Sequence, residues 1–149
     1  MGKAKGDRTV RVRRPPLTPP QKTIATLALV ILLVGLGNLV RAGVALYYAG
    51  SLPGMPMSVS WSYLAANGLL WGLALVGTAL GLTRQRRWSR LLALAVPTLY
   101  QAHEWANHLL FDASDYARQI WPRDAVLTVL FLAAVWGVLC WPSIRKAFD

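Results

Sequence analysis

The stretch that decides the fold is residues 24–49, which read IATLALVILLVGLGNLVRAGVALYYA. It is apolar almost throughout and contains one charged residue, Arg41. A bilayer core of roughly 30 Å is spanned by about 20 apolar helical residues, so this stretch is long enough to cross a membrane. Three further apolar windows come near that length, namely residues 63–82, 91–111 and 125–141. The sequence therefore predicts an all-α integral membrane protein, a four-transmembrane-helix up-down bundle over residues 23–149.

The composition of the chain argues against a soluble domain. Of the 149 residues, 55% are hydrophobic, and the mean hydropathy is +0.40. Too few polar residues remain to cover the surface of a soluble domain of this length. The net charge of +10 does not predict nucleic-acid binding, because the basic residues lie at the ends of the apolar windows rather than along one aromatic-rich face.

The charges between the windows predict the topology. Arginine and lysine are concentrated in residues 1–22, 84–90 and 145–146, whereas residues 51–62 carry no charge and residues 112–124 carry three aspartates and two arginines. By the positive-inside rule, the first three segments are cytoplasmic and the last two lie outside, so both termini are cytoplasmic. The basic, proline-rich segment 1–22 is expected to be a disordered cytoplasmic tail that can also bind anionic lipid.

The first window is expected to be an uncleaved span. It continues well past the apolar region of a secretory signal and has no clean small-residue cleavage site before Tyr47. The layout resembles that of small four-span prokaryotic membrane proteins, a resemblance that rests on span count and implies no functional residue. We expect a location in the prokaryotic cytoplasmic (inner) membrane.

Glycine spacing in the second window predicts close helix packing. Small residues four positions apart let helix backbones approach each other. Two such pairs occur, about 140° apart around the helix, so this helix is expected to pack on two neighbours, with homodimerisation as the alternative. The pairs are Gly68 with Gly72 and Gly77 with Gly81.

Polar side chains within the apolar windows form the candidate site. Such side chains are costly in a bilayer and commonly mark function. An unpaired arginine near mid-bilayer costs roughly 2.5–3.5 kcal/mol or more, so Arg41 is expected to pair with Glu104, the one acidic residue within a window. The predicted cluster comprises Asn38, Arg41, Asn67, Gln101, His103, Glu104, Asn107 and His108.

Several functions fit this pattern. The cluster can be a buried polar network that fixes helix register. We favour a non-catalytic accessory or stabilising subunit of a larger membrane complex, because the chain is small and has a basic arm and an apolar outer loop. The alternatives are an independent binder or transporter of a small solute, lipid or proton in an outward-facing pocket around Arg41 and Glu104, and a haem or pigment carrier through His103 or His108.

No motif predicts an enzyme. The string HEWANH at residues 103–108 differs from the zinc motif H-E-x-x-H because Asn107 occupies the place of the second histidine. Cys140 is the sole cysteine, so no disulfide forms within the chain, and it is expected to lie far from both histidines. The sequence requires no cofactor, and His103 and His108 are the candidate ligands if a metal or haem is bound.

Overall fold

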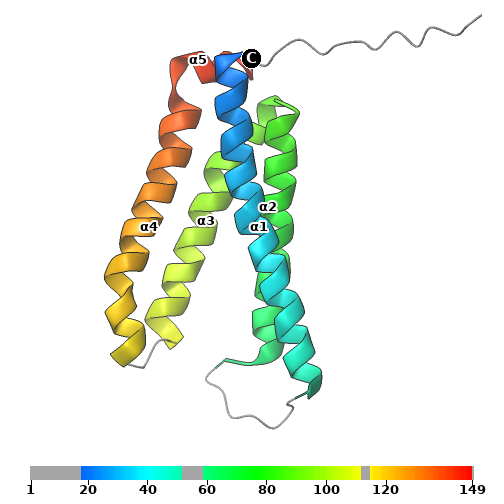
Figure 1. Ribbon diagram of the computed structural model, residues 1–149, viewed down its shortest axis with the longest axis vertical. Coiled ribbons are helices and arrows are strands. Elements are labelled where there is room, and N and C mark those ends of the chain that lie inside the picture. Colours follow the sequence, from blue (N-terminus) through cyan, green and yellow to red (C-terminus); the bar gives the residue numbers. More distant parts are fainter. Residues whose placement is uncertain (1–17, 52–58, 112–114, 149) are drawn as a thin grey trace, which may run out of the picture.

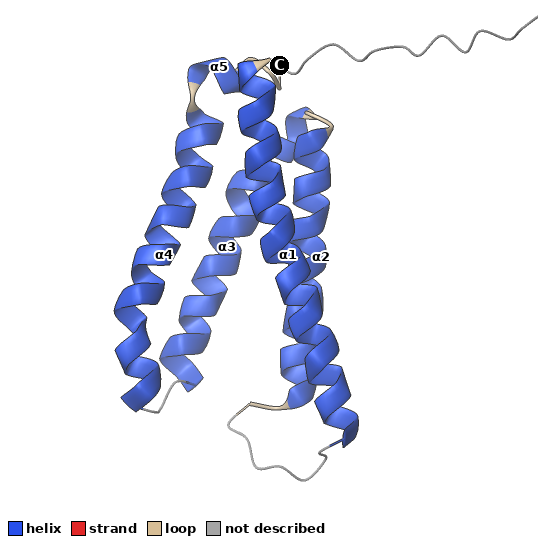
Figure 2. Cartoon of the chain, viewed as in Figure 1, coloured by secondary structure: helices blue, strands red, loops and turns tan. Residues whose placement is uncertain are grey.

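The computed structural model describes residues 18–51, 59–111 and 115–148. The described residues are all-helical and contain no strand (Figures 1 and 2). The helices are α1 (Pro19–Ser51), α2 (Trp61–Thr83), α3 (Arg87–Phe111), α4 (Asp115–Cys140) and the short α5 (Pro142–Arg145). The prediction of an all-α chain is therefore confirmed for this part of the molecule.

Three of these helices are long and apolar enough to cross a membrane. They are α1, α2 and the segment Gln119–Cys140 of α4. α3 has the length of a span, at 25 residues, but it begins with Arg87 and carries the polar segment 101–108. Its apolar character is correspondingly lower, and the crossing of a membrane by α3 stays a prediction.

The four long helices run alternately up and down, side by side (Figure 1). We call the end where α1 begins and α5 lies the α5 end, and the other the far end. The α5 end also contains the turn between α2 and α3, so three basic segments meet there. Their described cations are Lys22, Arg84, Arg86, Arg87, Arg90, Arg145 and Lys146.

Helix α1 begins earlier than the sequence analysis expected. The predicted tail extends to residue 22, but α1 begins at Pro19, and residues 1–17 lie outside the described part of the chain. The backbone N–H of Thr18 donates a hydrogen bond to Gln21 Oε1 at 3.0 Å, which is half of a capping box. Proline suits the first turn because the N–H that it lacks has no partner there.

Helix α4 also begins earlier than expected. The sequence analysis placed a loop over residues 112–124, whereas α4 starts at Asp115 and continues through Pro122 to Cys140. The sequence predicts a short interfacial helix here that ends before Pro122; α4 instead continues through this proline, which a membrane-type helix can accommodate. The apolar loop predicted over 51–62 falls mainly on residues 52–58, outside the described residues.

Helices α1 and α2 pack more closely than any other pair. A Cβ atom added at Gly68 would lie 2.7 Å from the backbone oxygen of Asn38, so the close approach of α1 requires glycine there. A Cβ at Gly72 would lie 2.5 Å from Leu39 Cδ2, a side-chain atom that can move, and 3.1 Å from the backbone oxygen of Gly35. Gly81 instead lies against Trp88 and Ser89 at the start of α3. A Cβ at Gly77 would meet nothing within 4 Å, so a packing role for Gly77 stays a prediction.

The apolar core lies toward the α5 end, where side chains of all five helices meet. Its fully buried members include Ile24, Ile31, Leu75, Leu82, Val135 and Leu139. Toward the far end α4 diverges from α1 (Figure 1), and only 11% of the apolar window of α4 is buried. This divergence opens the half of the molecule that contains the candidate site.

Candidate functional site: a groove between α1, α3 and α4

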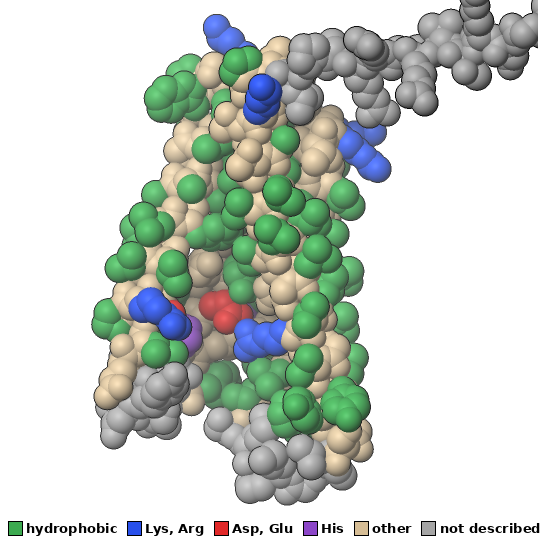
Figure 3. Space-filling view, viewed as in Figure 1, with side chains coloured by type: hydrophobic (Ala, Val, Ile, Leu, Met, Phe, Trp, Pro, Cys, Tyr) green, Lys and Arg blue, Asp and Glu red, His purple; other side chains and the backbone are tan. Residues whose placement is uncertain are grey.

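A groove of about 360 Å³ lies where α1 and α4 diverge. We call it the α3 groove, because most of its polar side chains come from that helix. Figure 3 shows a hollow on this face, with acidic and basic side chains next to each other in it. The lining residues are Val34 of α1; Tyr100, Gln101, Glu104, Trp105 and His108 of α3; and Asp124, Leu127, Thr128 and Phe131 of α4.

An ion pair joins α1 to α3 beside this groove. Arg41 Nη1 lies 3.5 Å from Glu104 Oε2, which is the pairing expected from the sequence. The Glu104 side chain is 19% exposed and the Arg41 side chain is 48% exposed, so much of the guanidinium stays accessible. The other carboxylate oxygen, Glu104 Oε1, is buried and accepts no hydrogen bond from any described residue. An unsatisfied buried acceptor costs roughly 1–3 kcal/mol, more when charged.

A second bridge between α1 and α3 lies one turn from the ion pair. Asn38 Nδ2 donates to Tyr100 Oη at 3.2 Å and to the Val34 carbonyl oxygen of its own helix at 3.0 Å. Asn38 and Arg41 are three residues apart on α1, and Tyr100 and Glu104 are four apart on α3, so each pair shares a helix face. The two bridges therefore fix one face of α1 against one face of α3.

Helix α3 is joined to α4 across the groove by a chain of hydrogen bonds. Thr128 Oγ1 donates to Gln101 Oε1 at 3.0 Å and accepts from Trp105 Nε1 at 3.1 Å. Closer to the α5 end, Trp136 Nε1 donates to Thr98 Oγ1 at 3.1 Å. These contacts join α3 to α4 along the part of α4 where little of its apolar surface is buried.

Two members of the predicted cluster face α2 instead of the groove. Tyr63 Oη donates to Asn107 Oδ1 at 2.7 Å and lies 3.4 Å from His103 Nε2. The His103 ring also packs on Trp71, with ring centroids 5.6 Å apart. His103 and Asn107 therefore belong to a separate network between α2 and α3.

The remaining predicted residues occupy different positions. Asn67 is buried in α2, and within the described residues no hydrogen bond joins it to the other predicted members. His108 lines the α3 groove, and its ring packs on Trp105 at 5.6 Å between centroids. His103 and His108 thus lie on different sides of α3 and do not share a site for one metal or haem. Across the described residues, no three His, Cys, Asp or Glu side chains lie close enough to hold a metal ion.

Sequence reasoning missed the aromatic partners of the polar residues. Tyr100 precedes Glu104 by one helical turn, and Trp105 follows Gln101 by one turn, so both lie on stripes that the sequence already marked as polar. Tyr63 gives no comparable signal, because it lies on another helix. A tyrosine or tryptophan in an apolar window usually finds a hydrogen-bond partner when buried, which is the signal that could have found the first two.

Comparisons with known proteins give no relative of this chain. No protein-family model matches it, and no curated protein or solved structure shows significant similarity to it.

Proposed function

We propose that this chain is an integral protein of a prokaryotic inner membrane, with spans formed by α1, α2, α3 and α4 and with the α5 end and both termini in the cytoplasm. Three helices have the length and composition of spans. The cations gathered at the α5 end favour a cytoplasmic location for it. Polar groups of α3 at Gln101, Glu104 and Asn107 are bonded to neighbouring helices, which lowers the cost of placing them in lipid.

Within this topology, we infer that the α3 groove binds a small amphiphilic molecule with an anionic group. The observation that carries this proposal is the Arg41–Glu104 pair, in which the guanidinium is nearly half exposed beside the groove. Glu104 engages one part of a planar group that has five N–H donors, so donors remain for a carboxylate or phosphate.

The groove is mixed in character, which supports an amphiphile over a fully polar solute. Val34, Leu127 and Phe131 provide apolar walls, and Gln101 and Thr128 provide polar atoms between them. The groove is also lined by two carboxylates, each paired with an arginine: Glu104 with Arg41 at 3.5 Å and Asp124 with Arg123 at 3.1 Å. An anion beside Arg41 would offset the cost of an exposed guanidinium in the outer half of a bilayer. The apolar part of the same molecule would lie against the aliphatic and aromatic walls.

The test uses decanoate and decanol as probes on the purified full chain in lipid nanodiscs. Both have the same apolar chain, and only decanoate is negatively charged. We expect decanoate to raise the Tm more than decanol does, and Arg41→Gln to remove that difference. Arg84→Gln, which removes an exposed cation at the α5 end, is expected to keep it. Equal shifts from both probes, or an unchanged decanoate effect in Arg41→Gln, would contradict the proposal.

A second candidate, an accessory subunit of a membrane complex, is favoured by the packing of α4. Only 11% of its apolar window is buried within the chain, against 33% for α1 and 44% for α2, so α4 has the most surface left for lipid, a membrane-protein partner or a second copy to cover. Native purification in mild detergent with mass spectrometry tests this reading. Stoichiometric partners would support the subunit role, and a partner-free monomer would count against it.

The same preparation tests the carrier alternative. A haem or pigment would give a visible absorbance band, and His103→Ala or His108→Ala would bleach it. A colourless peak would leave the groove as the site to pursue.

A further inference from the structure

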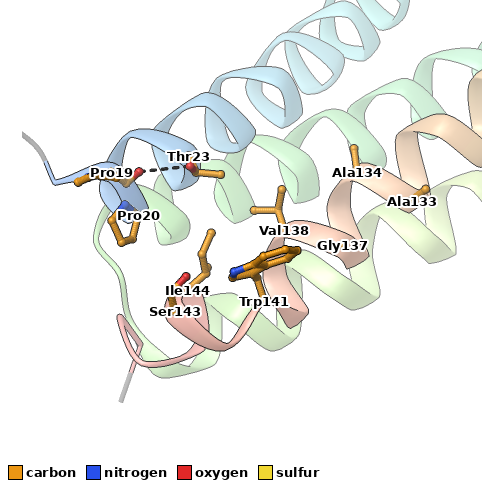
Figure 4. Close-up of a pocket in the computed structure, with 10 residues that line it drawn as sticks. All are labelled: Pro19, Pro20, Thr23, Ala133, Ala134, Gly137, Val138, Trp141, Ser143 and Ile144. Carbon is orange, nitrogen blue, oxygen red and sulfur yellow. Dashed lines mark hydrogen bonds between the residues drawn. The ribbon is translucent and has the colours of Figure 1, made fainter.

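A second groove, of about 570 Å³, lies at the α5 end between α1, α4 and α5. Figure 4 shows its lining side chains gathered around the space between these three helices. They include Pro19 and Thr23 of α1, Ala134 and Gly137 of α4, Trp141, and Ile144 of α5. The Thr23 hydroxyl donates to the Pro19 carbonyl oxygen at 3.2 Å, so this polar group is already satisfied within α1. We call this space the α5 groove.

The walls of the α5 groove suit a flexible apolar chain. Its α4 wall is built from small residues, and a Cβ added at Gly137 would meet nothing within 4 Å. Its volume falls within the range of about 300–1,000 Å³ that is usual for small-molecule sites. Trp141 stands at the junction of α4 and α5 with an exposed ring, the placement typical of tryptophan at a membrane interface.

In the sequence, two cations directly follow residues that line the groove. Arg145 and Lys146 are exposed and follow Ser143 and Ile144, which line the groove. The two carboxylates whose side chains are described, Glu104 and Asp124, line the other groove, toward the far end. A headgroup at the mouth of the α5 groove would therefore meet positive charge without a competing described acid.

The order of these features along the chain matches the order of parts in a phospholipid. Small apolar residues come first, at Ala134 and Gly137, then the interfacial Trp141, and then the cations Arg145 and Lys146. A second copy of this chain would present the same cations, so its α5 end would be repelled from this one. An anionic lipid has both complementary parts.

We propose that the α5 groove binds an anionic phospholipid, with one acyl chain against the α4 wall and the phosphate between Arg145 and Lys146. The inference rests on the membrane arrangement proposed above, and not on ligand binding in the α3 groove. It assigns the cytoplasmic end of the molecule a specific lipid site, distinct from general attraction of a basic tail to a charged surface.

The test is native mass spectrometry of the full chain in detergent, with phosphatidylglycerol or phosphatidylcholine of identical acyl chains. We expect wild type to retain phosphatidylglycerol preferentially. The double variant Arg145→Gln, Lys146→Gln should lose about tenfold or more in affinity, since each cation near an anionic surface contributes a factor of about five. The matched control, Arg84→Gln with Arg86→Gln, removes the same charge at the same end, away from the groove.

A second pair of variants tests the apolar wall. Gly137→Leu should fill the groove and lower phosphatidylglycerol retention severalfold, whereas Gly77→Leu should not, although a Cβ meets no atom within 4 Å at either glycine. Circular dichroism and thermal unfolding show that each variant is folded before lipid is added. Arg41→Gln should leave phosphatidylglycerol retention unchanged, which separates this site from the α3 groove.

Four results would overturn the proposal. Equal losses in the two double variants would show diffuse attraction without a site. Equal retention of phosphatidylglycerol and phosphatidylcholine would show that the headgroup is not recognised. No effect of Gly137→Leu would show that the acyl chain does not lie in the groove. A wild-type dimer that Gly137→Leu dissociates would show that a second copy covers it. If one of these results is obtained and decanoate still stabilises the chain more than decanol does, this inference fails while the proposed function of the α3 groove is supported.

Discussion

At the scale of single residues, two bridges hold α1 against α3, one from Asn38 to Tyr100 and one from Arg41 to Glu104. The first is a neutral hydrogen bond at 3.2 Å, and the second is an ion pair at 3.5 Å whose cation is half exposed. The exposed side of Arg41 is what makes the pair more than a structural bridge, because a fully buried pair would have no donors left for a ligand.

Charge reversal tests the ion pair. Arg41→Glu and Glu104→Arg each place like charges together across α1 and α3, so each should lower stability by about 1–3 kcal/mol, between the values for exposed and buried pairs. The double variant should recover part of that loss. Thermal unfolding of all four proteins in the same detergent measures the coupling. A double variant as unstable as the sum of the single ones would refute pairing.

The sequence was sufficient to pair Arg41 with Glu104, because no other carboxylate falls within an apolar window. By helical spacing, one stripe of α3 holds Gln101, Glu104 and His108, and the adjacent stripe holds His103 and Asn107. Helical spacing gives such stripes but not the neighbour that each one faces, which depends on where α2 and α4 pack. The separate network around Tyr63 therefore had to come from the structure.

At the scale of elements, close approach of α1 and α2 depends on glycines at particular places. Gly68→Ala would place its Cβ 2.7 Å from a backbone oxygen of α1, so the helices must shift apart, and we expect a loss of about 1–3 kcal/mol. Gly77→Ala is the control, because it meets open space and replaces a poor helix former with a good one. Denaturation midpoints measure the stability of both variants. Equal stability of Gly68→Ala and Gly77→Ala would contradict the close packing of α1 on α2 at Gly68.

Toward the far end, helix α4 is joined to α3 by the hydrogen bonds of Thr128. Thr128→Val removes the hydroxyl that joins Gln101 and Trp105. The free energy needed to open the half of α4 at the far end should therefore fall by about 1–2 kcal/mol. Hydrogen exchange over α4 measures this. Thr78→Val is the control, because that hydroxyl bonds only the Ala74 carbonyl of its own helix. Equal exchange of α4 in both variants would show that the contact is dispensable.

The ends of the helices were the least predictable elements. The start of α1 was recoverable, because Thr18, Pro19, Pro20 and Gln21 form the pattern of a capping box with proline in the first turn. The continuity of α4 was not, because Pro122 predicts the end of a helix, whereas α4 continues through it from Asp115 to Cys140. Propensity is a weak guide where tertiary contacts decide.

At the scale of the whole molecule, the two ends differ in both packing and charge. The α5 end has the apolar core and most of the described cations, and the far half has the diverging helices and the ion pair. Hydropathy alone predicts this difference between the two ends only in part, because it identifies apolar helices but not the angles at which they pack against each other. The divergence of α4 from α1, which opens the groove, follows from packing that one sequence does not specify.

The most direct test of this account is labelling of single cysteines in intact cells with a membrane-impermeant maleimide. In a Cys140→Ser background, His108→Cys places a thiol in the α3 groove, and Ser143→Cys places one in the α5 groove. The account predicts that the first is labelled from outside and the second only after the membrane is permeabilised. Labelling of the second but not the first in intact cells would contradict both the orientation and the outward-facing groove.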